Sequence, residues 1–377
     1  MDKDITIRDA ILGDIKINDT ERKIIDDPHF QRLRYIRQVG FLYLTYPGAN
    51  HTRFEHSIGT MKVTKDICEA LGIENAELVV SGLLHDIGHA PFSHQSEDIM
   101  KRYLHKDHEQ VGAEIISKSS IRDKISDSNL SYKKLISYIK GAHPSEIICG
   151  AVGSDRIDYL VRDSYYTGTA YGMIETDRIK GKMAISGGHL GIKESGLQVA
   201  ESILIARYYM FISAYTHHTT IIAGGMFDRA LDLAIGAGEI DPKSILNESD
   251  YSIMARLAAS ETEASKISKR ITERRLLKRI YYKPIHENDL AEKVREKVST
   301  LDIDQDNTII RAIKLKGGSD DIDIIDKNRK ISGKLSEKSE LFAKLSETMR
   351  NRTMLLVAAE EKDRKKVEAA TSKILGA

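Results

Sequence analysis

Three histidines and an aspartate lie within ten residues in the stretch LLHDIGHAPFSH, residues 83–94, at the end of the apolar run LVVSGLL. His85 and Asp86 are adjacent where a helix is expected to end, so both side chains can be aimed at one place. Imidazole and carboxylate groups together are ligands that divalent metal ions accept in proteins. The stretch therefore indicates a metal site, and further ligands are expected elsewhere in the chain.

Two other segments supply the expected partners of this pair. In NHTRFEHSIG, His56 lies on the same helical face as Ile67, so its side chain is expected to point inward. In GSDRIDYLVRD, Asp155 begins a stripe of polar residues spaced four apart. Burying histidine and aspartate side chains without partners costs about several kcal/mol, which favours a bound cation. The predicted ligands of one divalent metal ion are His56, His85, Asp86 and Asp155.

The alternative is that these four residues belong to separate hydrogen-bond networks. If they converge, their mixed ligation leaves positions open for water and substrate, and Mg, Mn, Fe, Ni and Zn all tolerate it. Histidines near the pair titrate near neutral pH, so each could donate a proton or bind a phosphate oxygen. These histidines are His89, His94 and His108.

Arginine side chains are the candidate phosphate ligands, because a guanidinium group can bind two phosphate oxygens at once. An ordinary charge on a helix surface is the alternative, above all for Arg207. The candidates are Arg53, Arg156 and Arg207.

The composition is that of an ordinary globular protein. Lys and Arg total 57 and Asp and Glu total 56 in 377 residues, so the chain lacks the basic excess of a dedicated nucleic-acid binder. Cys68 and Cys149 lie among apolar neighbours, which argues for a reducing compartment and against disulfides or a thiolate zinc site. The N-terminus does not resemble a signal peptide, and no apolar run approaches the roughly 20 residues that span a bilayer. We expect a soluble, cytoplasmic protein with no membrane partner.

Helical patterns dominate from about residue 20 to about residue 300. Residues 27–40 combine a helix-start signal with a glycine stop, and residues 53–72 repeat apolar side chains at helical spacing. Residues 196–218 are expected to form one long helix. Hairpins are expected within residues 1–20 and around Gly187-Gly188.

Near residue 300 the pattern changes. NTIIRAIKLKGG and RTMLLVAAEE are typical of strands, and EKDRKKVEAATSKIL is typical of a closing amphipathic helix. The predicted fold is mainly α, with an all-helical core, a small β-hairpin and a small C-terminal α+β appendage. The expected divisions are a core over residues 1–235, a helical extension over 236–300, and an α+β domain over 301–377.

Four separated motifs, HTRFEH, LLHDIGHAPFSH, DHEQ and SDRIDYLVRD, resemble those of the HD-domain phosphohydrolases in order and spacing. The similarity is greatest to the deoxynucleoside triphosphate (dNTP) triphosphohydrolase branch, which includes bacterial dGTPases, and it covers roughly residues 5–230. It implies an HD core with one divalent ion, occasionally two, in a homo-oligomer, commonly a dimer or tetramer. The implied reaction converts a dNTP, such as dGTP, and water into deoxynucleoside and triphosphate.

The resemblance also implies catalytic roles. The histidines of PFSH and HEQ line the family's catalytic pocket and match His94 and His108, while Glu97 lies where an acidic residue orients the first of them. His94 is the expected proton donor. The implied catalytic residues are His94, His108, Glu97 and His89.

A substrate-binding set follows from the same resemblance. The family's glutamine and aspartate that hold the sugar 3′-hydroxyl match Gln38 and Asp163, and Tyr159 matches a tyrosine whose ring would clash with a 2′-hydroxyl. Arg156 stands where vertebrate relatives have Lys, which keeps the charge but changes its reach. The implied substrate-binding residues are Gln38, Arg53, Arg156, Tyr159, Asp163, Arg207 and Tyr215.

An activator-nucleotide site is implied at the positions of Asp26, Gln31 and Arg34, which in tetrameric relatives recognise a guanine. The chain has Arg8 where those relatives have Asn, and the C-terminal segment does not obviously supply the other activator contacts. The alternative is a packing helix with solvated arginines.

Two other functions are compatible with these residues. The same metal ligands would serve an HD phosphohydrolase or phosphodiesterase that acts on nucleoside monophosphates, cyclic nucleotides or other phosphate esters. The basic run KISKRITERRLLKR, residues 266–279, could contact phosphates in a nucleotide- or nucleic-acid-binding module with little catalysis. Flanking acidic residues favour a solvated helix face or a subunit contact instead.

Overall fold

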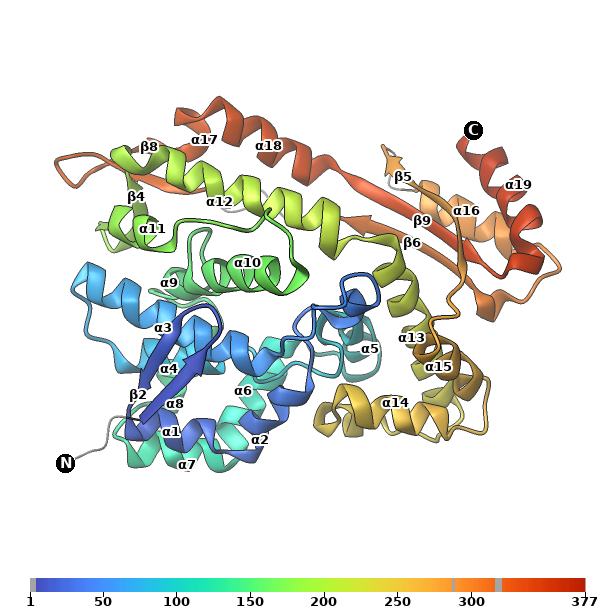
Figure 1. Cartoon of the computed structure of the whole chain (residues 1–377), viewed down its shortest axis with the longest axis horizontal. Coiled ribbons are helices and arrows are strands. Elements are labelled where there is room, and N and C mark those ends of the chain that lie inside the picture. The colour runs from blue at the N-terminus through green and yellow to red at the C-terminus, as the bar shows by residue number, and fades with distance from the viewer. Residues whose placement is uncertain (1–4, 287–288, 316–320, 377) are drawn as a thin grey trace.

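Helices make up most of the molecule, which confirms the predicted mainly α class (Figure 1). The computed structural model describes residues 5–286, 289–315 and 321–376. Among these residues, no helix is both long and apolar enough to cross a bilayer. Helices before the interior hairpin are α1 (Asp19–Ile25), α2 (Pro28–Gln31), α3 (Arg53–Leu71), α4 (Ala76–Leu84), α5 (Glu97–Ile99), α6 (His108–Lys118), α7 (Ser120–Asp127), α8 (Tyr132–Ile139), α9 (Glu146–Cys149), α10 (Ser154–Thr167) and α11 (Thr176–Lys182). Those after it are α12 (Leu197–Met210), α13 (His218–Gly236), α14 (Asp250–Ala258), α15 (Ala264–Thr272), α16 (Leu290–Ser299), α17 (Leu335–Lys338), α18 (Glu340–Asn351) and α19 (Arg364–Leu375).

Helix α3 lies inside the helical core and carries His56. It begins at a capping box between Thr52 and Glu55 and ends at Gly72, which adopts the left-handed conformation. Its side chains are buried on nearly all sides because α4 and α10 pack against it. A Cβ added to Gly59 would lie 2.0 Å from a carboxylate oxygen of Asp158, so glycine lets α10 approach closely. The packing places His56 between α4 and α10.

The predicted N-terminal hairpin is confirmed for the described residues as β1 (Ile5–Asp9) and β2 (Gly13–Ile17); residues 1–4 lie outside them. Asp9 Oδ1 accepts hydrogen bonds from the backbone N–H groups of Ile11 and Leu12, which shapes the turn. Ile15 of β2 is fully buried in the core, so the hairpin is held against the helices.

The segment DPHFQRLRYIRQVG does not form the single helix that the sequence predicted. Helix α2 is followed by a 3₁₀ turn at Arg32–Tyr35, and the chain is extended after that. Residues 36–38 then pair with residues 51–53, directly before α3. This tertiary pairing takes up the backbone hydrogen bonds that a longer helix would have made.

The helix predicted over residues 196–218 is interrupted. Helix α12 ends at Met210, a π-helical turn covers Phe211–Tyr215, and α13 begins at His218. The carbonyl groups of Phe211 and Ser213 accept hydrogen bonds from the side chains of Thr216 and Tyr46. These side-chain bonds replace part of the regular helical pattern.

The interior hairpin is confirmed as β3 (Met183–Ser186) and β4 (His189–Lys193), with Gly187 and Gly188 both at positive φ in its turn. Two strands that the sequence analysis did not predict extend it. β7 (Asp323–Ile325) pairs parallel to β4, and β8 (Ile331–Lys334) pairs antiparallel to β7.

A second C-terminal sheet has the order β5–β9–β6 with antiparallel pairing. β9 (Thr353–Ala359) and β6 (Thr308–Lys314) were predicted; residues 316–318 of the predicted β6 segment lie outside the described residues. β5 (Lys278–Ile285) corrects the prediction that residues 236–300 are helical. Helices α16 and α19 pack on one face of this sheet and α13 on the other, so β9 is buried on both sides.

Both sheets combine strands from either side of residue 300, and α18 packs against α12 (Figure 1). The strand pairing thus crosses the expected boundaries at residues 235 and 300. The division into a core, an extension and a C-terminal domain stays a prediction.

Candidate metal and substrate site

Four side chains from three helical segments meet at one point. His56 comes from α3, His85 and Asp86 follow α4, and Asp155 lies in the first turn of α10. His56 Nε2 lies 3.0 Å from Asp155 Oδ1 and 3.4 Å from Asp86 Oδ2. His85 Nε2 lies 3.7 Å and 3.4 Å from the same two atoms. The two imidazoles and the two carboxylates therefore face one small volume.

The hydrogen bonds of the two histidines leave their inner nitrogens available to a cation. His85 Nδ1 lies 2.8 Å from the carbonyl oxygen of Gly82, which can only accept, so Nδ1 carries the proton. His56 Nδ1 donates to Asp158 Oδ2 at 2.9 Å. Both Nε2 atoms are buried and have no hydrogen-bond partner among the described residues. Burial lowers the pKa of His56, but its contacts with the Asp155 and Asp158 carboxylates and the charge of Asp86 raise it to about 10, so a bound metal ion would take the place of a proton on Nε2. His56, His85 and Asp155 place their ligand atoms close enough together to hold such an ion, and Asp86 lies beside them.

The carboxylates are kept ionised by this arrangement. Burial alone would raise the pKa values of Asp86 and Asp155. Positive neighbours outweigh this effect, so both pKa values lie below that of an ordinary aspartate. For Asp86 the first of these neighbours is Arg53, whose Nη1 lies 2.5 Å from Oδ2. For Asp155 they are the two histidines. Ionised carboxylates are the form that binds a cation.

A buried ionic chain supports His56 from behind. Asp158 accepts from Arg162 through both of its oxygens, at 2.8 and 2.9 Å, and Arg162 reaches Asp9 Oδ2 at 2.9 Å. Arg162 is fully buried. This ionic chain links the turn of the N-terminal hairpin to His56 and so helps to orient the ring of that candidate ligand. Sequence analysis missed Asp9, Asp158 and Arg162.

A second group of histidines lies beside the candidate ligands. The rings of His89 and His108 stack with centroids 4.0 Å apart, and His89 Nε2 lies 3.3 Å from Asp86 Oδ1. Glu97 Oε1 lies 2.7 Å from His94 Nδ1 and 3.0 Å from His108 Nδ1, so one carboxylate orients both rings. Burial, with the charges of Arg53 and His108, lowers the pKa of His89 well below its usual value. His89 is therefore neutral at physiological pH.

Arg53 holds the loop that carries these histidines. Its Nε donates to Ser93 Oγ at 2.9 Å, in addition to the contact with Asp86. Its Nη2 reaches the Gln38 carbonyl at 3.4 Å. Because its donors bind protein groups, Arg53 positions Asp86 and the loop as well as adding positive charge.

A cavity of about 630 Å³ joins the candidate ligands to the expected substrate-binding residues. His56 is fully buried and is the one candidate ligand that does not line the cavity. Ile313 and Lys314, at the end of β6, also line it, so the C-terminal sheet contributes to its wall. The predicted residues that line it are Gln38, Arg53, His85, Asp86, His89, His94, Glu97, His108, Asp155, Arg156, Tyr159, Asp163, Arg207 and Tyr215.

Asp163 is held rigidly in this cavity. Tyr215 donates its hydroxyl to Asp163 Oδ2 at 2.6 Å, and His51 Nε2 lies 2.7 Å from Oδ1. The His51 ring stacks on Tyr166 at 4.7 Å. His51 was missed by sequence analysis, although it stands only five residues before His56 in the same motif.

Arg156 and Arg207 approach the cavity from α10 and α12. Arg156 Nη1 donates to the Ala151 carbonyl at 3.0 Å, and the Arg207 guanidinium lies 5.5 Å from the ring centre of Phe211. These contacts fix where the two positive charges enter the cavity.

The residues of the predicted activator site lie away from this cavity. Gln31 Oε1 accepts from Arg34 Nε at 2.8 Å, and the Arg34 guanidinium lies 3.5 Å from the ring centre of Phe54. Asp26 pairs with Arg22 at the surface. These contacts suit the packing alternative, and the activator site stays a prediction.

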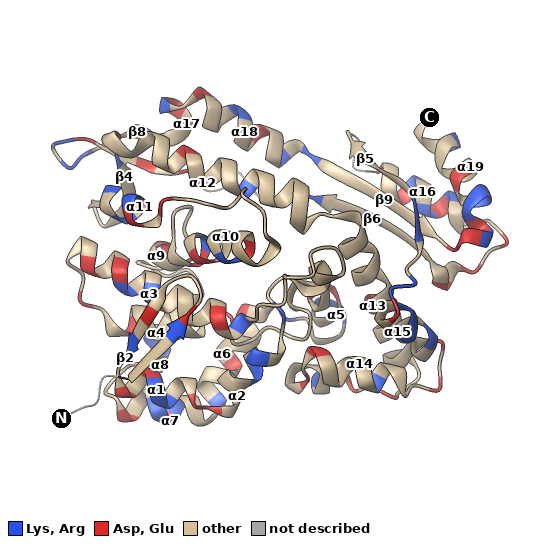
Figure 2. Cartoon of the chain, viewed as in Figure 1, with Lys and Arg blue, Asp and Glu red and all other residues tan. Residues whose placement is uncertain are grey.

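The basic run of residues 266–279 has acidic partners. Lys266 pairs with Glu263, and Arg270 with Glu360. Lys and Arg are mixed with Asp and Glu over the molecule (Figure 2). The run is therefore better described as a solvated, ion-paired segment than as a nucleic-acid surface.

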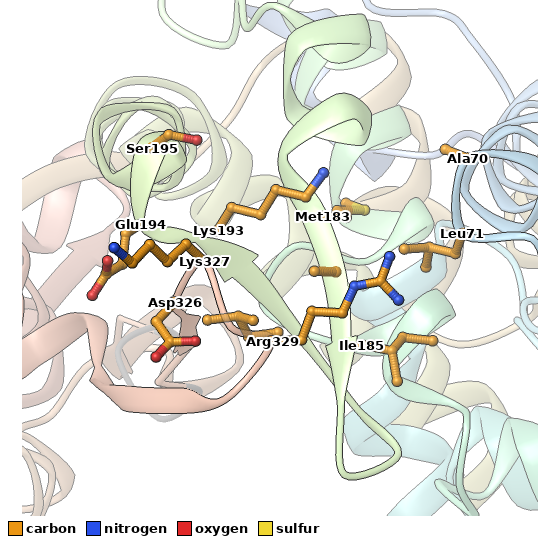
Figure 3. A pocket seen from close by; sticks show the side chains of 12 residues that line it. Ala70, Leu71, Met183, Ile185, Lys193, Glu194, Ser195, Asp326, Lys327 and Arg329 are labelled. Atoms are coloured by element: carbon orange, nitrogen blue, oxygen red, sulfur yellow. The ribbon is translucent and has the colours of Figure 1, made fainter.

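A second cavity, of about 480 Å³, lies where the C-terminus of α3, the β3–β4 hairpin and the β7–β8 turn meet (Figure 3). Lys193, Lys327 and Arg329 line it together with Glu194 and Asp326. None of the described residues that line it is a histidine or a cysteine. It therefore lacks the ligand chemistry of the first cavity.

Gly88 lets the loop after the His-Asp pair contact α6. A Cβ at this position would lie 2.0 Å from the His108 carbonyl oxygen and 2.3 Å from Gly112 N. Gly88→Ala is expected to lower the free energy of unfolding by about 1–3 kcal/mol through overpacking. Urea unfolding measures this change.

Gly181→Ala is the matched control. Its Cβ would meet no atom of the described chain within 4 Å, and Gly181 lies inside α11. It should raise the free energy of unfolding by about 0.4–1 kcal/mol. Equal responses of the two variants would contradict the close approach of the loop to α6.

The all-helical core and the convergence of His56, the His85-Asp86 pair and Asp155 define an HD-domain protein. Residues 53–163 match the HD domain family, and residues 174–377 match the family described as HD associated region. The chain belongs to the HD-domain phosphohydrolase superfamily.

Known proteins show how far this similarity extends. An uncharacterized protein of Methanocaldococcus jannaschii is 41% identical over 288 residues, 73% of this chain. The deoxynucleoside triphosphate triphosphohydrolase SAMHD1 homolog of Dictyostelium discoideum is 31% identical over 307 residues, 72% of this chain. The matches span 59% of the length of each of these relatives.

Solved structures match nearly the whole chain. A hypothetical protein from Aquifex aeolicus aligns with a TM-score of 0.83 and 26% identity over 98% of this chain and 100% of its own. A phosphohydrolase from Bacteroides thetaiotaomicron aligns with a TM-score of 0.78 and 25% identity over 95% of this chain and 100% of its own. The similarity thus includes the C-terminal sheets.

Proposed function

We propose that the protein is a metal-dependent dNTP triphosphohydrolase. The observation that carries the proposal is a pair of hydrogen-bond acceptors in the cavity that the candidate ligands line. The Asp163 carboxylate is oriented by His51 and Tyr215. Gln38 Oε1 is buried and has no hydrogen-bond partner within the described part of the chain. Both groups can accept a hydrogen bond from a 3′-hydroxyl.

One divalent ion would be held by His56, His85, Asp86 and Asp155. Such an ion supplies positive charge beside a phosphate and makes water a stronger nucleophile. Arg156 and Arg207 add positive charge in the same cavity, where they would bind the triphosphate. The combined positive charge of the ion and the two arginines suits a highly anionic substrate.

The reaction is hydrolysis at the α-phosphorus. A water oxygen forms a bond to this phosphorus, the bond from phosphorus to the 5′-oxygen breaks, and the 5′-oxygen takes up a proton. His94, whose Nδ1 bonds to Glu97, is the proton donor in this proposal. Glu97 and His108 keep the ring oriented, and neutral His89 contacts Asp86 beside them.

Deoxyribose preference follows from Tyr159. Its ring lies 6.4 Å from that of Tyr215, and both line the cavity near Asp163. An aromatic wall next to a fixed acceptor leaves little room for an added 2′-hydroxyl. dGTP is a suitable first substrate.

Asp163→Ala tests the substrate assignment. It should leave the metal content unchanged and lower kcat/KM for dNTPs by about 10²-fold, because a charged hydrogen bond of roughly 1.5–3 kcal/mol is lost. Metal analysis and a triphosphate assay on one preparation measure both quantities. Normal dNTP turnover by this variant would contradict the assignment.

Product analysis separates this proposal from the other HD phosphohydrolase activities. The four dNTPs and four NTPs are incubated with Mg, Mn, Fe, Ni or Zn. Inorganic triphosphate supports the proposal, and orthophosphate supports an esterase acting on smaller phosphate esters.

The assembly proposed is a homo-oligomer, a dimer or tetramer. Tyr171 and Tyr209 stack with centroids 5.4 Å apart and are 46% and 43% exposed, and Met173, two residues after Tyr171, is 76% exposed. Exposed apolar side chains that gather on a surface mark protein interaction sites, so these residues are the candidates for the subunit contact. Light scattering on the purified protein measures the assembly.

A further inference from the structure

Asp250 contacts the catalytic loop from a distant part of the chain. It is the first residue of α14, and only 1% of its surface is exposed. Its Oδ1 accepts from the backbone N–H of Phe92 at 2.6 Å, and its Oδ2 accepts from the backbone N–H of Arg37 at 3.0 Å. The Arg37 guanidinium lies 3.4 Å from Oδ2. One carboxylate thus joins α14 to two segments around the site.

The loop held by Asp250 has a strained backbone. Phe92 and Ser93 adopt consecutive left-handed conformations, with φ of 56° and 55°. This region is unfavourable for a bulky side chain, so neighbouring contacts must hold the loop there. The residue that follows is His94, the proposed proton donor.

Arg32 adds a second connection between the same parts. Its guanidinium donates to the carbonyl oxygens of Ile87 and His89 at 3.1 and 2.7 Å, and to that of Glu248 at 3.2 Å. Glu248 stands two residues before Asp250. Arg32 therefore links the segment just before α14 to the start of the loop that contains His89 and His94, while Asp250 binds the loop directly at Phe92.

We propose that Asp250 is a positioning residue that holds residues 89–94 in the conformation needed for catalysis. It acts through the Phe92 N–H and not by contact with substrate. This inference rests on the proposed function, because the loop delivers His94. It gives the segment after residue 236 a role in the active site.

The charge state of Asp250 makes this role testable. Burial raises its pKa to about 6, although hydrogen bonds from Arg37 and Phe92 act in the opposite direction. The other charged or titratable groups facing it are Arg32, Tyr43 and Tyr251. The folded protein binds this proton more tightly than the unfolded chain, whose carboxyl has the ordinary pKa of 3.8. Stability from this group therefore falls as pH rises from about 4 to 6, and the full cost is present above pH 6.

Asp250→Asn separates positioning from folding. At pH 7.5 a neutral side chain avoids the cost of a buried charge, so the melting temperature should be unchanged or raised. kcat for dNTP hydrolysis should fall by about 10-fold, because a charged acceptor for Phe92 is lost, with KM and metal content unchanged. Amide hydrogen exchange in residues 88–97 should speed up by a similar factor. The matched control is Glu261→Gln, which makes the same change at an exposed carboxylate shortly after α14.

Unchanged kcat and unchanged exchange in the variant would overturn the inference. A lowered melting temperature with exchange faster throughout the chain would also overturn it, since that marks a purely structural residue. If the wild type hydrolyses no dNTP, the proposed function fails while the exchange measurement still decides the inference. If the variant does not fold, exchange in the wild type decides. The hydrogen bonds from Phe92 and Arg37 favour the ionised carboxylate, so protonation of Asp250 weakens them although it removes the cost of a buried charge. After correction for intrinsic rates, residues 88–97 must lose protection relative to the rest of the chain between pH 7 and pH 5, and constant relative protection overturns the inference.

Discussion

Asp155→Asn is expected to remove the bound metal and to lower phosphohydrolase turnover by about 10³-fold. Asp155 Oδ1 lies 3.0 and 3.7 Å from the two inner imidazole nitrogens, so it completes the candidate ligand group. A neutral amide oxygen is a weaker ligand for a divalent ion than a carboxylate. Losing several kcal/mol of charge stabilisation corresponds to about a thousandfold loss of rate.

The Asp155 side chain is 32% exposed, so the variant should fold normally. Metal content by mass spectrometry and turnover of dGTP are measured on one preparation. Glu69→Gln, a carboxylate-to-amide change at an exposed position of α3, is the control and should retain both. Full metal occupancy together with normal turnover in Asp155→Asn would show that these four residues do not form the metal site.

Arg162→Met is expected to lower the free energy of unfolding by about 3–5 kcal/mol. Arg162 is fully buried and neutralises Asp158 and Asp9. Methionine fills similar space but leaves two buried carboxylates without their cation, which is the costly way to break a buried ion pair. His56 then loses its fixed partner, so metal affinity should fall as well.

Denaturant unfolding at two pH values tests this expectation. Unpaired buried carboxyls have raised pKa values in the folded state, so the deficit should shrink as the pH is lowered from 7.5 to 5. Arg178→Met is the control, because Arg178 and its partner Glu175 are mostly exposed, and a surface pair of this kind contributes at most about 1 kcal/mol. Similar losses in the two variants would mean that the ionic chain behind His56 contributes little.

Most of the candidate site could be proposed from the spacing of residue types. His56, the His85-Asp86 pair and Asp155 could be proposed as partners because unpaired polar groups at inward positions need a charge or a cation. Motif resemblance then added Gln38, Tyr159 and Asp163, all of which line the same cavity. These inferences need only the residue types, their local periodicity and the order of the motifs along the chain.

Other contacts could not be predicted, because they join residues far apart in sequence. His51 touches Asp163 across 112 positions, and Asp250 touches Phe92 across 158. The same holds for strands: KRIYYKPI was assigned to a helical extension, because its strand partner β9 lies some 70 residues further on. The ends of helices were misjudged for this reason too, since the pairing of residues 36–38 with 51–53 ended the helix that began at Pro28.

Local sequence patterns were sufficient to predict the mainly helical class and the two hairpins, and to propose the groups that would bind a metal. These depend on backbone geometry and side-chain chemistry within a few neighbouring residues. Which carboxylate supports which histidine, which side chains hold the loop before His94, and how the C-terminal sheet reaches the cavity became visible only in the folded molecule. Such contacts depend on where distant segments pack, and that is set by the burial of the whole core and not by any local pattern.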